Sequence, residues 1–297
     1  MSAAALLLVL VSAGAHALWN FLMKRALGAS AGTRPFVALS KACEAVVFLP
    51  AFVAVAWRQP PGSMAAVAPY AAVGTLLVLA SYATLGAAYR HGDLAFAYPI
   101  ARGGMLLFLP PMGWLAFGER VGPLGWAAVA LIVAGVCAMQ LPALSAAGLR
   151  TLGRRLTGAP ALLALLMALL LAAGAVWDKH AVRRVPLFAY FYAYTAGAAV
   201  CYAAATLRAD GPRVVRATWA AHGRAAAAVG VLSMTSYGLA LAALRAGGST
   251  YVVGLRQLSI AAGVWLGVRY LGERFDAPRR AGVALIVAGC LLMAAGR

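Results

Sequence analysis

The sequence predicts an all-α integral membrane protein whose ten transmembrane helices form two inverted repeats of five. Three observations predict this fold: an apolar composition, ten apolar runs of bilayer length, and an internal duplication. Of the 297 residues, 64% are hydrophobic and 11% are charged, whereas about a quarter of the residues in a soluble domain are charged. The composition therefore excludes an ordinary soluble protein.

Ten apolar runs are long enough to cross a bilayer, which takes roughly 20 residues each. The runs are continuous and do not alternate with period two, so they predict helices rather than the strands of a barrel. The connections between them are too short to hold a soluble domain. The predicted spans are 2–23, 35–57, 66–89, 93–117, 121–141, 159–177, 186–207, 222–244, 247–271 and 277–296.

The net charge of +18 does not indicate a nucleic-acid partner. A basic soluble domain would suggest one, but these arginines are scattered over helix ends and short loops, where they anchor and orient a protein in the lipid bilayer. The cysteines offer no metal or redox site, because none forms a CxxC pair or lies near a histidine at ligand spacing. We therefore expect no cofactor. The four cysteines are Cys43, Cys137, Cys201 and Cys290.

The two halves of the chain repeat one another. GERVGPLGWAAVALIVAG at 118–135 matches GERFDAPRRAGVALIVAG at 272–289, and SYATLGAAYRHGD at 81–93 matches SYGLALAALRAGG at 236–248. Single residues correspond as well: Arg102 with Arg256, Glu119 with Glu273, and Trp19–Asn20 with Trp177–Asp178.

The duplication predicts a first repeat over 1–141, a linker over 142–158 and a second repeat over 159–297. Five helices per repeat is an odd number, so the second copy enters the membrane from the opposite side and the copies are inverted. Inverted repeats are typical of secondary transporters that expose one central site to each side of the membrane in turn.

These motifs resemble the EamA branch of the drug/metabolite transporter superfamily. The likeness rests on the W-N-x-x-x-K turn of Trp19, Asn20 and Lys24, and on G-E-R before an apolar helix in each half. It covers nearly the whole chain. It implies a multi-pass transporter or exporter of the cell inner membrane that moves small metabolites or drugs.

Members of that family usually keep both termini in the cytoplasm. Counting Lys and Arg residues would invert this orientation, because the loops on the other side carry more of them. We follow the family in this expectation.

Ionisable groups deep inside a span are costly, so they indicate function. Lys41 and Glu44 are three residues apart and therefore share a helix face. Either they form an ion pair that lets the helix insert, or Lys41 contacts an anionic substrate while Glu44 orients it or exchanges a proton. Glu44 is the only carboxylate that we expect well inside a span; Asp178 and the other acids are expected at or near loops.

Arg102 and Arg256 occupy matching places, after Pro99 in one copy and Gly254 in the other. A loosened backbone beside a guanidinium can bind an anion, so the pair favours a carboxylate, phosphate or phosphonate on the substrate. The alternative is that both arginines reach an interface or bond to carbonyls of neighbouring helices.

Other candidates for the cavity wall are polar or aromatic. His16, Asn20 and Lys24 recur at i, i+4 and i+8 and share a face with Trp19 beside them; the alternative is helix packing. Tyr98 and Tyr251 are the aromatic candidates, although such residues also pack or sit at membrane interfaces.

Several motif residues are expected to be structural. The G-E-R turns should fix the tight helix connections, with their carboxylates bound to nearby amides or arginines. Gly263 and Gly267 form GxxxG, which permits close helix approach, and Gly135 and Gly289 take equivalent packing positions. The G-E-R residues concerned are Gly118, Glu119, Gly272 and Glu273.

The sequence therefore predicts a secondary transporter, an exporter or exchanger of a small organic metabolite with an anionic group favoured, that rocks one repeat against the other. Proton coupling through Glu44 is left open, as is a monomer against a homodimer. The alternatives are a non-transporting structural or assembly protein and an intramembrane enzyme. No Ser/His/Asp arrangement or HExxH motif supports an enzyme, so we expect none.

Overall fold

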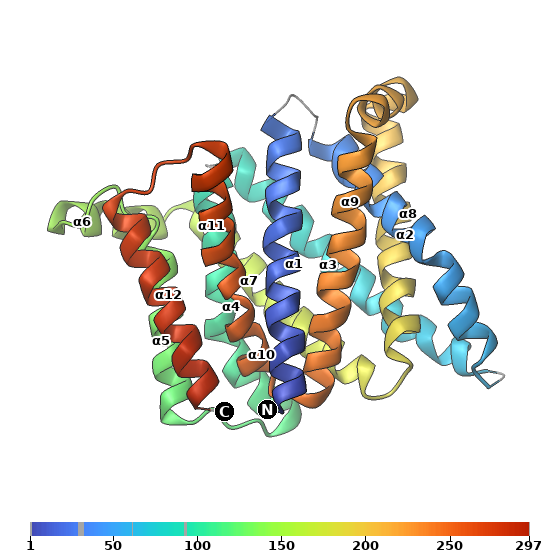
Figure 1. The fold of residues 1–297 in the computed structure, drawn as a ribbon, viewed down its shortest axis with the longest axis horizontal. Coiled ribbons are helices and arrows are strands. Elements are labelled where there is room, and N and C mark those ends of the chain that lie inside the picture. Colours follow the sequence, from blue (N-terminus) through green and yellow to red (C-terminus); the bar gives the residue numbers. More distant parts are fainter. Residues whose placement is uncertain (1, 29–32, 61, 92–93, 297) are drawn as a thin grey trace.

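A computed structural model describes residues 2–28, 33–60, 62–91 and 94–296; the side chains of 85, 86 and 89–98 lie outside this description. Every regular element in the described part is an α-helix (Figure 1). The helices are α1 Ala3–Gly28, α2 Thr33–Trp57, α3 Ser63–His91, α4 Leu94–Phe117, α5 Pro123–Ala138, α6 Ala146–Leu156, α7 Ala159–Val182, α8 Leu187–Ala209, α9 Gly211–Ala246, α10 Ser249–Arg256, α11 Leu258–Leu271 and α12 Ala277–Ala295.

The prediction of an all-α membrane protein is confirmed, and the count of ten spans is approximate. Nine helical segments of the described chain are long and apolar enough to cross a membrane, with Ser249–Leu271 counted as one. The remaining predicted span, 121–141, contains α5, which has 16 residues and reaches about 24 Å at 1.5 Å per residue. Its length falls short of the roughly 30 Å hydrocarbon layer.

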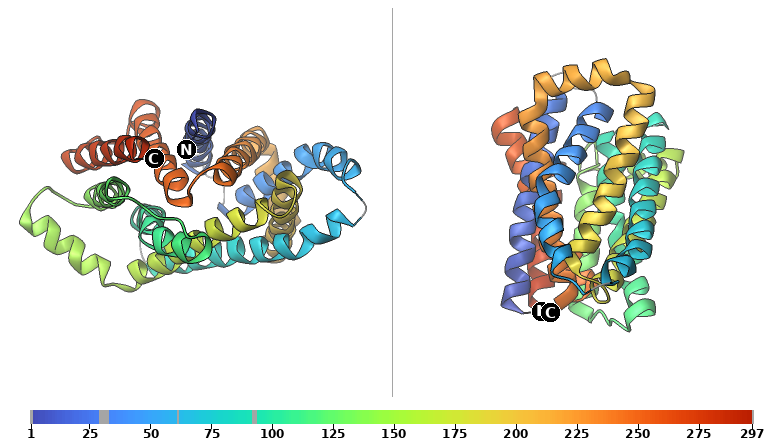
Figure 2. Two further views of the ribbon diagram at one scale, coloured as in Figure 1. Left: turned by 90° about the horizontal axis from the view of Figure 1, so that it is seen from below. Right: turned by 90° about the vertical axis from the view of Figure 1, so that its right-hand side faces the viewer.

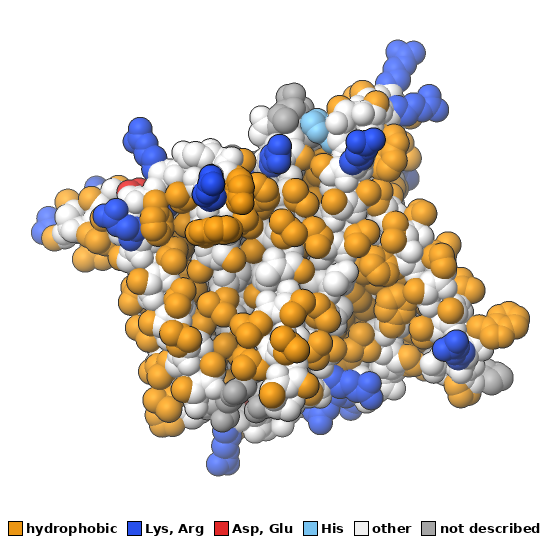
Figure 3. Space-filling view, in the orientation of Figure 1, with side chains coloured by type: hydrophobic (Ala, Val, Ile, Leu, Met, Phe, Trp, Pro, Cys, Tyr) orange, Lys and Arg blue, Asp and Glu red, His pale blue; other side chains and the backbone are white. Residues whose placement is uncertain are grey.

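The side-chain distribution agrees with a bundle embedded in a bilayer. Hydrophobic side chains cover the middle of the visible face, and Lys and Arg side chains gather toward its two ends (Figure 3). The first residues of α1 and the last of α12 lie at the same end, which we call the terminal end (Figure 1). Termini at one end require an even number of crossings, which the nine longer segments reach only with the shorter α5 as a tenth.

The span of α10 and α11 is broken directly after Arg256. The amide of Gln257 donates to the carbonyl of Gly254 at 3.0 Å, and the amide of Ile260 donates to the carbonyl of Gln257 at 2.8 Å. These i to i−3 bonds tighten the chain between the two helices. The break puts the Arg256 side chain at the end of a half-helix inside the bundle.

The two repeats interleave instead of forming two separate bundles. The most extensive helix pairs each join one helix of 1–141 to one helix of 159–297: α5 with α12, α1 with α9, α4 with α7, α3 with α7, α2 with α8, and α2 with α9. Pairs within a repeat, such as α4 with α5, share far less surface.

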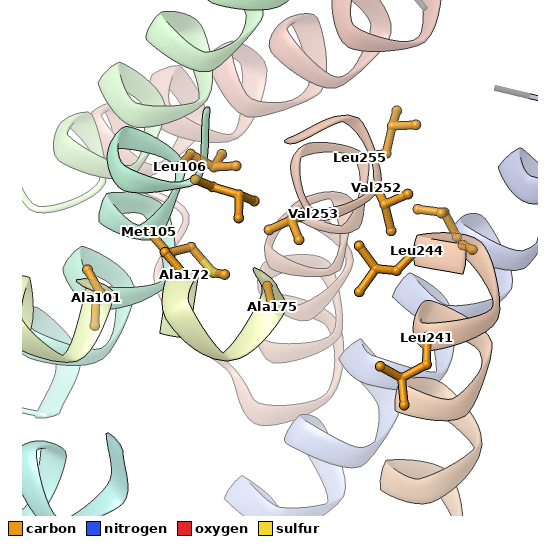
Figure 4. Packing of buried hydrophobic residues seen from close by; sticks show 14 of the residues in the cluster. Ala101, Met105, Leu106, Ala172, Ala175, Leu241, Leu244, Val252, Val253 and Leu255 are labelled. Carbon is orange, nitrogen blue, oxygen red and sulfur yellow. The ribbon is translucent and has the colours of Figure 1, made fainter. Parts of the chain in front are cut away.

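Small and aliphatic side chains fill the contact between the repeats. In Figure 4, Ala101 and Met105 of α4 lie beside Ala172 of α7, while Leu244 of α9 lies toward Val253 of α10. All five side chains are buried, with exposed fractions of 8% or less. The shared core is therefore built from both halves of the sequence.

Glycines let α5 and α12 approach closely, but the GxxxG pair does not do so for α11. A Cβ at Gly135 would lie 2.7 Å from the carbonyl oxygen of Gly282, and one at Gly289 would lie 2.9 Å from that of Ala128. A Cβ at Gly263 would meet no atom within 4 Å. The expected close helix approach at Gly263 is therefore wrong, because this face of α11 borders a cavity.

Candidate functional site

A cavity of about 160 Å³ lies between α1, α2, α3, α4, α7, α8, α9 and α10. Side chains from both repeats border it, so neither half could form it alone. Six of the residues singled out in the sequence line its wall: His16, Trp19, Lys41, Glu44, Arg102 and Arg256.

The two matched arginines meet at one histidine. Nη2 of Arg102 lies 2.7 Å from Nε2 of His16, and Nη2 of Arg256 lies 3.2 Å from Nδ1 of the same ring. The indole N–H of Trp19 also points at Nδ1, at 3.2 Å. A neutral imidazole has only one acceptor nitrogen, so the ring cannot accept from all three donors. At His16, donors therefore outnumber acceptors.

Arg256 is held firmly by its neighbours. Its Nε donates to the hydroxyl of Ser12 at 3.0 Å and its Nη2 to the hydroxyl of Ser236 at 3.3 Å. The two serines in turn donate to each other's carbonyls across α1 and α9, at 2.7 and 2.9 Å. The guanidinium carbon also lies 5.1 Å from the ring centre of Tyr237, a favourable cation–π distance.

Arg102 has fewer contacts than its counterpart. Its side chain is half-buried, and its hydrogen bond goes to His16. Among the described residues, no carboxylate lies within ion-pair distance of Arg102. This guanidinium therefore borders the cavity with a positive charge that no described acid neutralises.

Lys41 and Glu44 form the expected pair on α2. Nζ of Lys41 lies 2.7 Å from Oε2 of Glu44. The Glu44 side chain is 1% exposed, against 19% for Lys41, so the carboxylate is enclosed while the ammonium still reaches the cavity. The geometry is compatible with both interpretations of the pair.

Asp178 is the residue that the sequence reasoning misplaced. It is 5% exposed and borders the cavity, so the expectation that Glu44 is the only carboxylate well inside a span is wrong. The hydroxyls of Tyr190 and Tyr237 each donate to its carboxylate at 2.5 Å. Helix α7 runs to Val182, beyond the predicted end at 177. The correspondence of Trp177–Asp178 with Trp19–Asn20 in the duplication could have identified Asp178, because Asn20 was already a candidate for the cavity wall.

The remaining candidates lie elsewhere. Asn20 donates to the carbonyl of His16 in its own helix at 2.7 Å and borders a second cavity. Tyr251 directs its hydroxyl toward Gly125 of α5 and lines neither cavity. The side chain of Tyr98 lies outside the described residues.

The second cavity, of about 540 Å³, lies toward the end opposite the termini. Lys24, Arg279 and Glu273 lie at its wall, and His16 and Arg102 border both cavities. These two residues therefore separate the central cavity from the wider space beside α11.

The two G-E-R turns have the same backbone geometry. Gly118 and Gly272 both have a φ of 67°, and the amides of Glu119 and Glu273 each donate to a carbonyl six residues earlier at 3.3 Å. A positive φ favours glycine at the end of a helix. The turns thus close the connections α4–α5 and α11–α12.

Each G-E-R carboxylate also reaches into the other repeat. Glu119 forms an ion pair with Lys179 and accepts from the amide of Ser249 at 2.8 Å. Glu273 forms an ion pair with Lys24, and also accepts from Arg279 of its own repeat. The two cross-repeat contacts lie at opposite ends of the bundle, and the one at Glu119 is the more buried.

Comparisons with known proteins agree with this architecture. Residues 158–295 match the family described as the EamA-like transporter family. Solved structures match as well, in 28 chains. One crystal structure of a protein is 18% identical, covers 96% of this chain and 95% of its own, and has a TM-score of 0.71. That likeness supports the fold. Among curated proteins, none matches the chain.

Proposed function

We propose that this chain, whose residues 158–295 match the EamA-like transporter family, carries a small organic solute with an anionic group across the membrane by alternating access. The family match and the nine long apolar helical segments of the described residues support a multi-pass membrane transporter of the drug/metabolite transporter superfamily. The proposal adds the chemistry of the solute and the site that binds it. It also places the protein in the cell inner membrane, as an exporter or exchanger.

The observation that carries the proposal is the meeting of Arg102 and Arg256 at His16. Matching residues of two inverted repeats are brought to one point on the cavity wall, with more donors there than acceptors. An anionic group accepts hydrogen bonds from guanidinium groups in a planar, often bidentate geometry. Such a group would supply the acceptors that the histidine ring lacks.

The charge around the cavity supports an anion as well. Apart from His16 and four tyrosines, its ionisable wall residues are three basic side chains and two acidic ones: Lys41, Arg102, Arg256, Glu44 and Asp178. Ionised together they leave one positive charge in excess. A charge buried at membrane depth is costly unless it is paired, so a solute with one negative charge would be favoured.

Lys41 and Glu44 take complementary roles in this proposal. The ammonium of Lys41 contacts the solute, and the enclosed carboxylate of Glu44 holds that ammonium in place at 2.7 Å. Proton exchange at Glu44 is the competing role. A Glu44→Gln variant that still exchanges solute but loses its response to a pH gradient would favour proton exchange.

The interleaved fold bears on which parts move. The cavity lies between α1, α2, α8 and α9 on one side and α3, α4 and α7 on the other, and each group contains helices of both repeats. We propose that these mixed groups move against each other. The contact of Glu119 with Lys179 joins the end of α4 to α7 within one of these groups, so it should persist through the movement.

The test is a ligand panel on the purified protein. Thermal stability is measured with carboxylates, phosphonates, phosphorylated metabolites and cationic drugs, for the wild type, for Arg102→Ala/Arg256→Ala, and for the control Arg58→Ala/Arg245→Ala. The control removes two exposed arginines away from the cavity. A ligand at a hundred times its Kd stabilises by about 2.7 kcal/mol.

We expect an anionic compound to stabilise the wild type and the control but not the cavity variant, and the same compound to cross liposome membranes. The proposal fails if only neutral or cationic compounds stabilise the protein and the cavity variant responds equally. A protein that binds no member of the panel and moves none would instead support a structural or assembly role.

A further inference from the structure

Two helical segments lie outside the bundle core, at the end opposite the termini. The first is α6, within the linker between the repeats. It projects sideways from the bundle, across the direction of the spans (Figures 1 and 2). Ser145 caps it by accepting from the amide of Gly148 at 3.1 Å, so it is a defined helix and not an extended linker.

The second segment is the beginning of α9. This helix has 36 residues, about 54 Å at 1.5 Å per residue, which exceeds the thickness of the hydrocarbon layer. Its first turns run across the end of the bundle before the helix turns into a span (Figure 2, right). The span predicted from hydropathy began only at residue 222.

Both segments are basic and contain no acidic residue. Helix α6 carries Arg150, Arg154 and Arg155, and residues 211–224 carry three further arginines: Arg213, Arg216 and Arg224. Arg150, Arg154, Arg213 and Arg216 are exposed. In the part of the chain that the structure describes, none of these four lies within ion-pair distance of a carboxylate.

Each segment also exposes large apolar side chains beside its arginines. On α6, Leu149, Leu152 and Leu156 recur at i, i+3 and i+7 and share one face. Leu152 is buried against the protein, but Leu149 on the same face is 61% exposed. Trp219 at the start of α9 is 50% exposed. An apolar face that the protein covers only in part is suited to the headgroup boundary of a bilayer.

We propose that α6 and residues 211–224, which lie on opposite sides of the bundle at the same end (Figure 1), form two separate parts of a binding surface for anionic phospholipids of the membrane that surrounds the protein. The arginines pair with lipid phosphates, and the leucines and Trp219 enter the boundary between headgroups and acyl chains. The position and the charge of the two segments both favour lipid as the partner. The segments lie at the end of a membrane-spanning bundle, in the plane where headgroups are found, and clustered arginines near a membrane attract anionic lipid.

The proposal has a consequence for orientation. The cytoplasmic leaflet carries the negative surface potential, and basic loops are retained on that side. The lipid-binding surface would therefore face the cytoplasm and both termini the other side, the reverse of the orientation that the family resemblance implies.

The test measures which lipids the full-length protein retains. Purified protein is equilibrated in mild detergent with equal amounts of phosphatidylglycerol and phosphatidylcholine, and the phospholipid that co-purifies is quantified. The variants are Arg150→Gln/Arg154→Gln, Arg213→Gln/Arg216→Gln and their combination. The matched control is Arg58→Gln/Arg245→Gln, two exposed arginines of the terminal end.

We expect the wild type and the control to retain at least about three times more phosphatidylglycerol than phosphatidylcholine. The ratio should fall with each pair, reach about one in the combination, and fall in 500 mM salt because screening weakens the attraction. A combined variant that keeps the wild-type ratio would overturn the proposal, as would a control that loses it equally.

A soluble polyanion is the competing occupant. If duplex DNA or polyglutamate binds the wild type in neutral lipid with the same arginine dependence, and phosphatidylglycerol is not enriched, the surface docks a soluble partner and the proposal is wrong. Orientation has its own readout: an Ala147→Cys variant on α6, with the four native cysteines replaced by serine, should react with an impermeant maleimide only after cells are opened. Labelling of intact spheroplasts would overturn the cytoplasmic placement.

Discussion

Arg102 and Arg256 approach opposite ring nitrogens of His16, at 2.7 and 3.2 Å. Their sequence positions correspond in the duplication, yet their surroundings differ. Arg256 is 8% exposed and is tied to Ser12 and Ser236, whereas Arg102 is half-buried. The inverted repeat has thus produced one anchored guanidinium and one more loosely held guanidinium at the same histidine.

Because of this difference, substitutions at the two arginines should affect ligand affinity and the free energy of unfolding differently. Arg102→Gln should lower the affinity for an anionic ligand at least tenfold, because a charge-assisted hydrogen bond contributes about 1.5–3 kcal/mol. It should change the free energy of unfolding by less than about 1 kcal/mol. Arg256→Gln should lower both, since three hydrogen bonds within the bundle depend on it. Isothermal titration and detergent unfolding measure the two quantities, and an equal loss of stability in both variants would contradict the distinction.

The Lys41–Glu44 pair should fail when either member is removed alone. Lys41→Met leaves an enclosed carboxylate without its partner, which costs about 3–5 kcal/mol in buried pairs, and Glu44→Gln leaves the ammonium unpaired. The double variant should recover most of this loss in unfolding experiments. Transport then distinguishes the roles, because a stable double variant that still transports would show that the pair only supports the helix.

Asp178 should act through its hydrogen bonds in folding and through its charge in binding. Asp178→Ala removes the acceptor of two buried hydroxyls, each of which costs about 1–3 kcal/mol when unsatisfied. Asp178→Asn keeps an acceptor oxygen for one of the two tyrosine hydroxyls and removes the negative charge, so it should lose less stability than Asp178→Ala and bind an anion more tightly than the wild type. Weaker anion binding in Asp178→Asn would count against this view.

The two G-E-R carboxylates should contribute unequally to stability. Lys179 and Glu119 have exposed fractions of 7% and 17%, whereas Lys24 is 63% exposed. Glu119→Gln should therefore cost roughly 3 kcal/mol, and Glu273→Gln at most about 1 kcal/mol, as solvent screens that pair. Thermal unfolding of the two variants side by side gives the comparison. Equal losses of stability in the two variants would contradict this expectation.

Glycine substitutions test the contact between α5 and α12. Gly135→Ala places a methyl 2.7 Å from the carbonyl oxygen of Gly282, and forcing such overlap costs about 1–3 kcal/mol. Gly263→Ala is the matched control, because nothing lies within 4 Å of its added methyl. The control should unfold at or slightly above the wild-type temperature, since alanine favours a helix more than glycine does.

Hydropathy predicted most of the fold, because bilayer thickness sets the length of a span. It placed helix ends less well. The sequence placed the end of the span at Trp177, before Asp178. Helix α7 continues past this point, and tyrosines from α8 and α9 supply the donors that the Asp178 carboxylate needs. Those partners are distant in sequence, so no local pattern could reveal them. The bend in α9 escaped prediction for the same reason, whereas the break after Arg256 lies close to Gly254, where a loosened backbone was expected.

The site was predicted where the duplication could be used and missed where helix rotation decided the outcome. Matching the repeats identified Arg102 and Arg256, and both border the cavity. Asn20 was chosen because it shares a helix face with His16, and Tyr251 because it is aromatic, but neither side chain lines the central cavity. Periodicity gives a helix its faces, but only the surrounding helices determine which face meets the cavity.

The interleaving of the helices changes what the linker 142–158 does. Every extensive interface joins the first half to the second, so a protease that cuts within the linker would release neither half. The nicked product should still migrate as one particle in native electrophoresis and separate into two fragments only in denaturant. Continuity of the chain then serves assembly, by delivering both halves to the same place in equal number, rather than the cohesion of the finished protein.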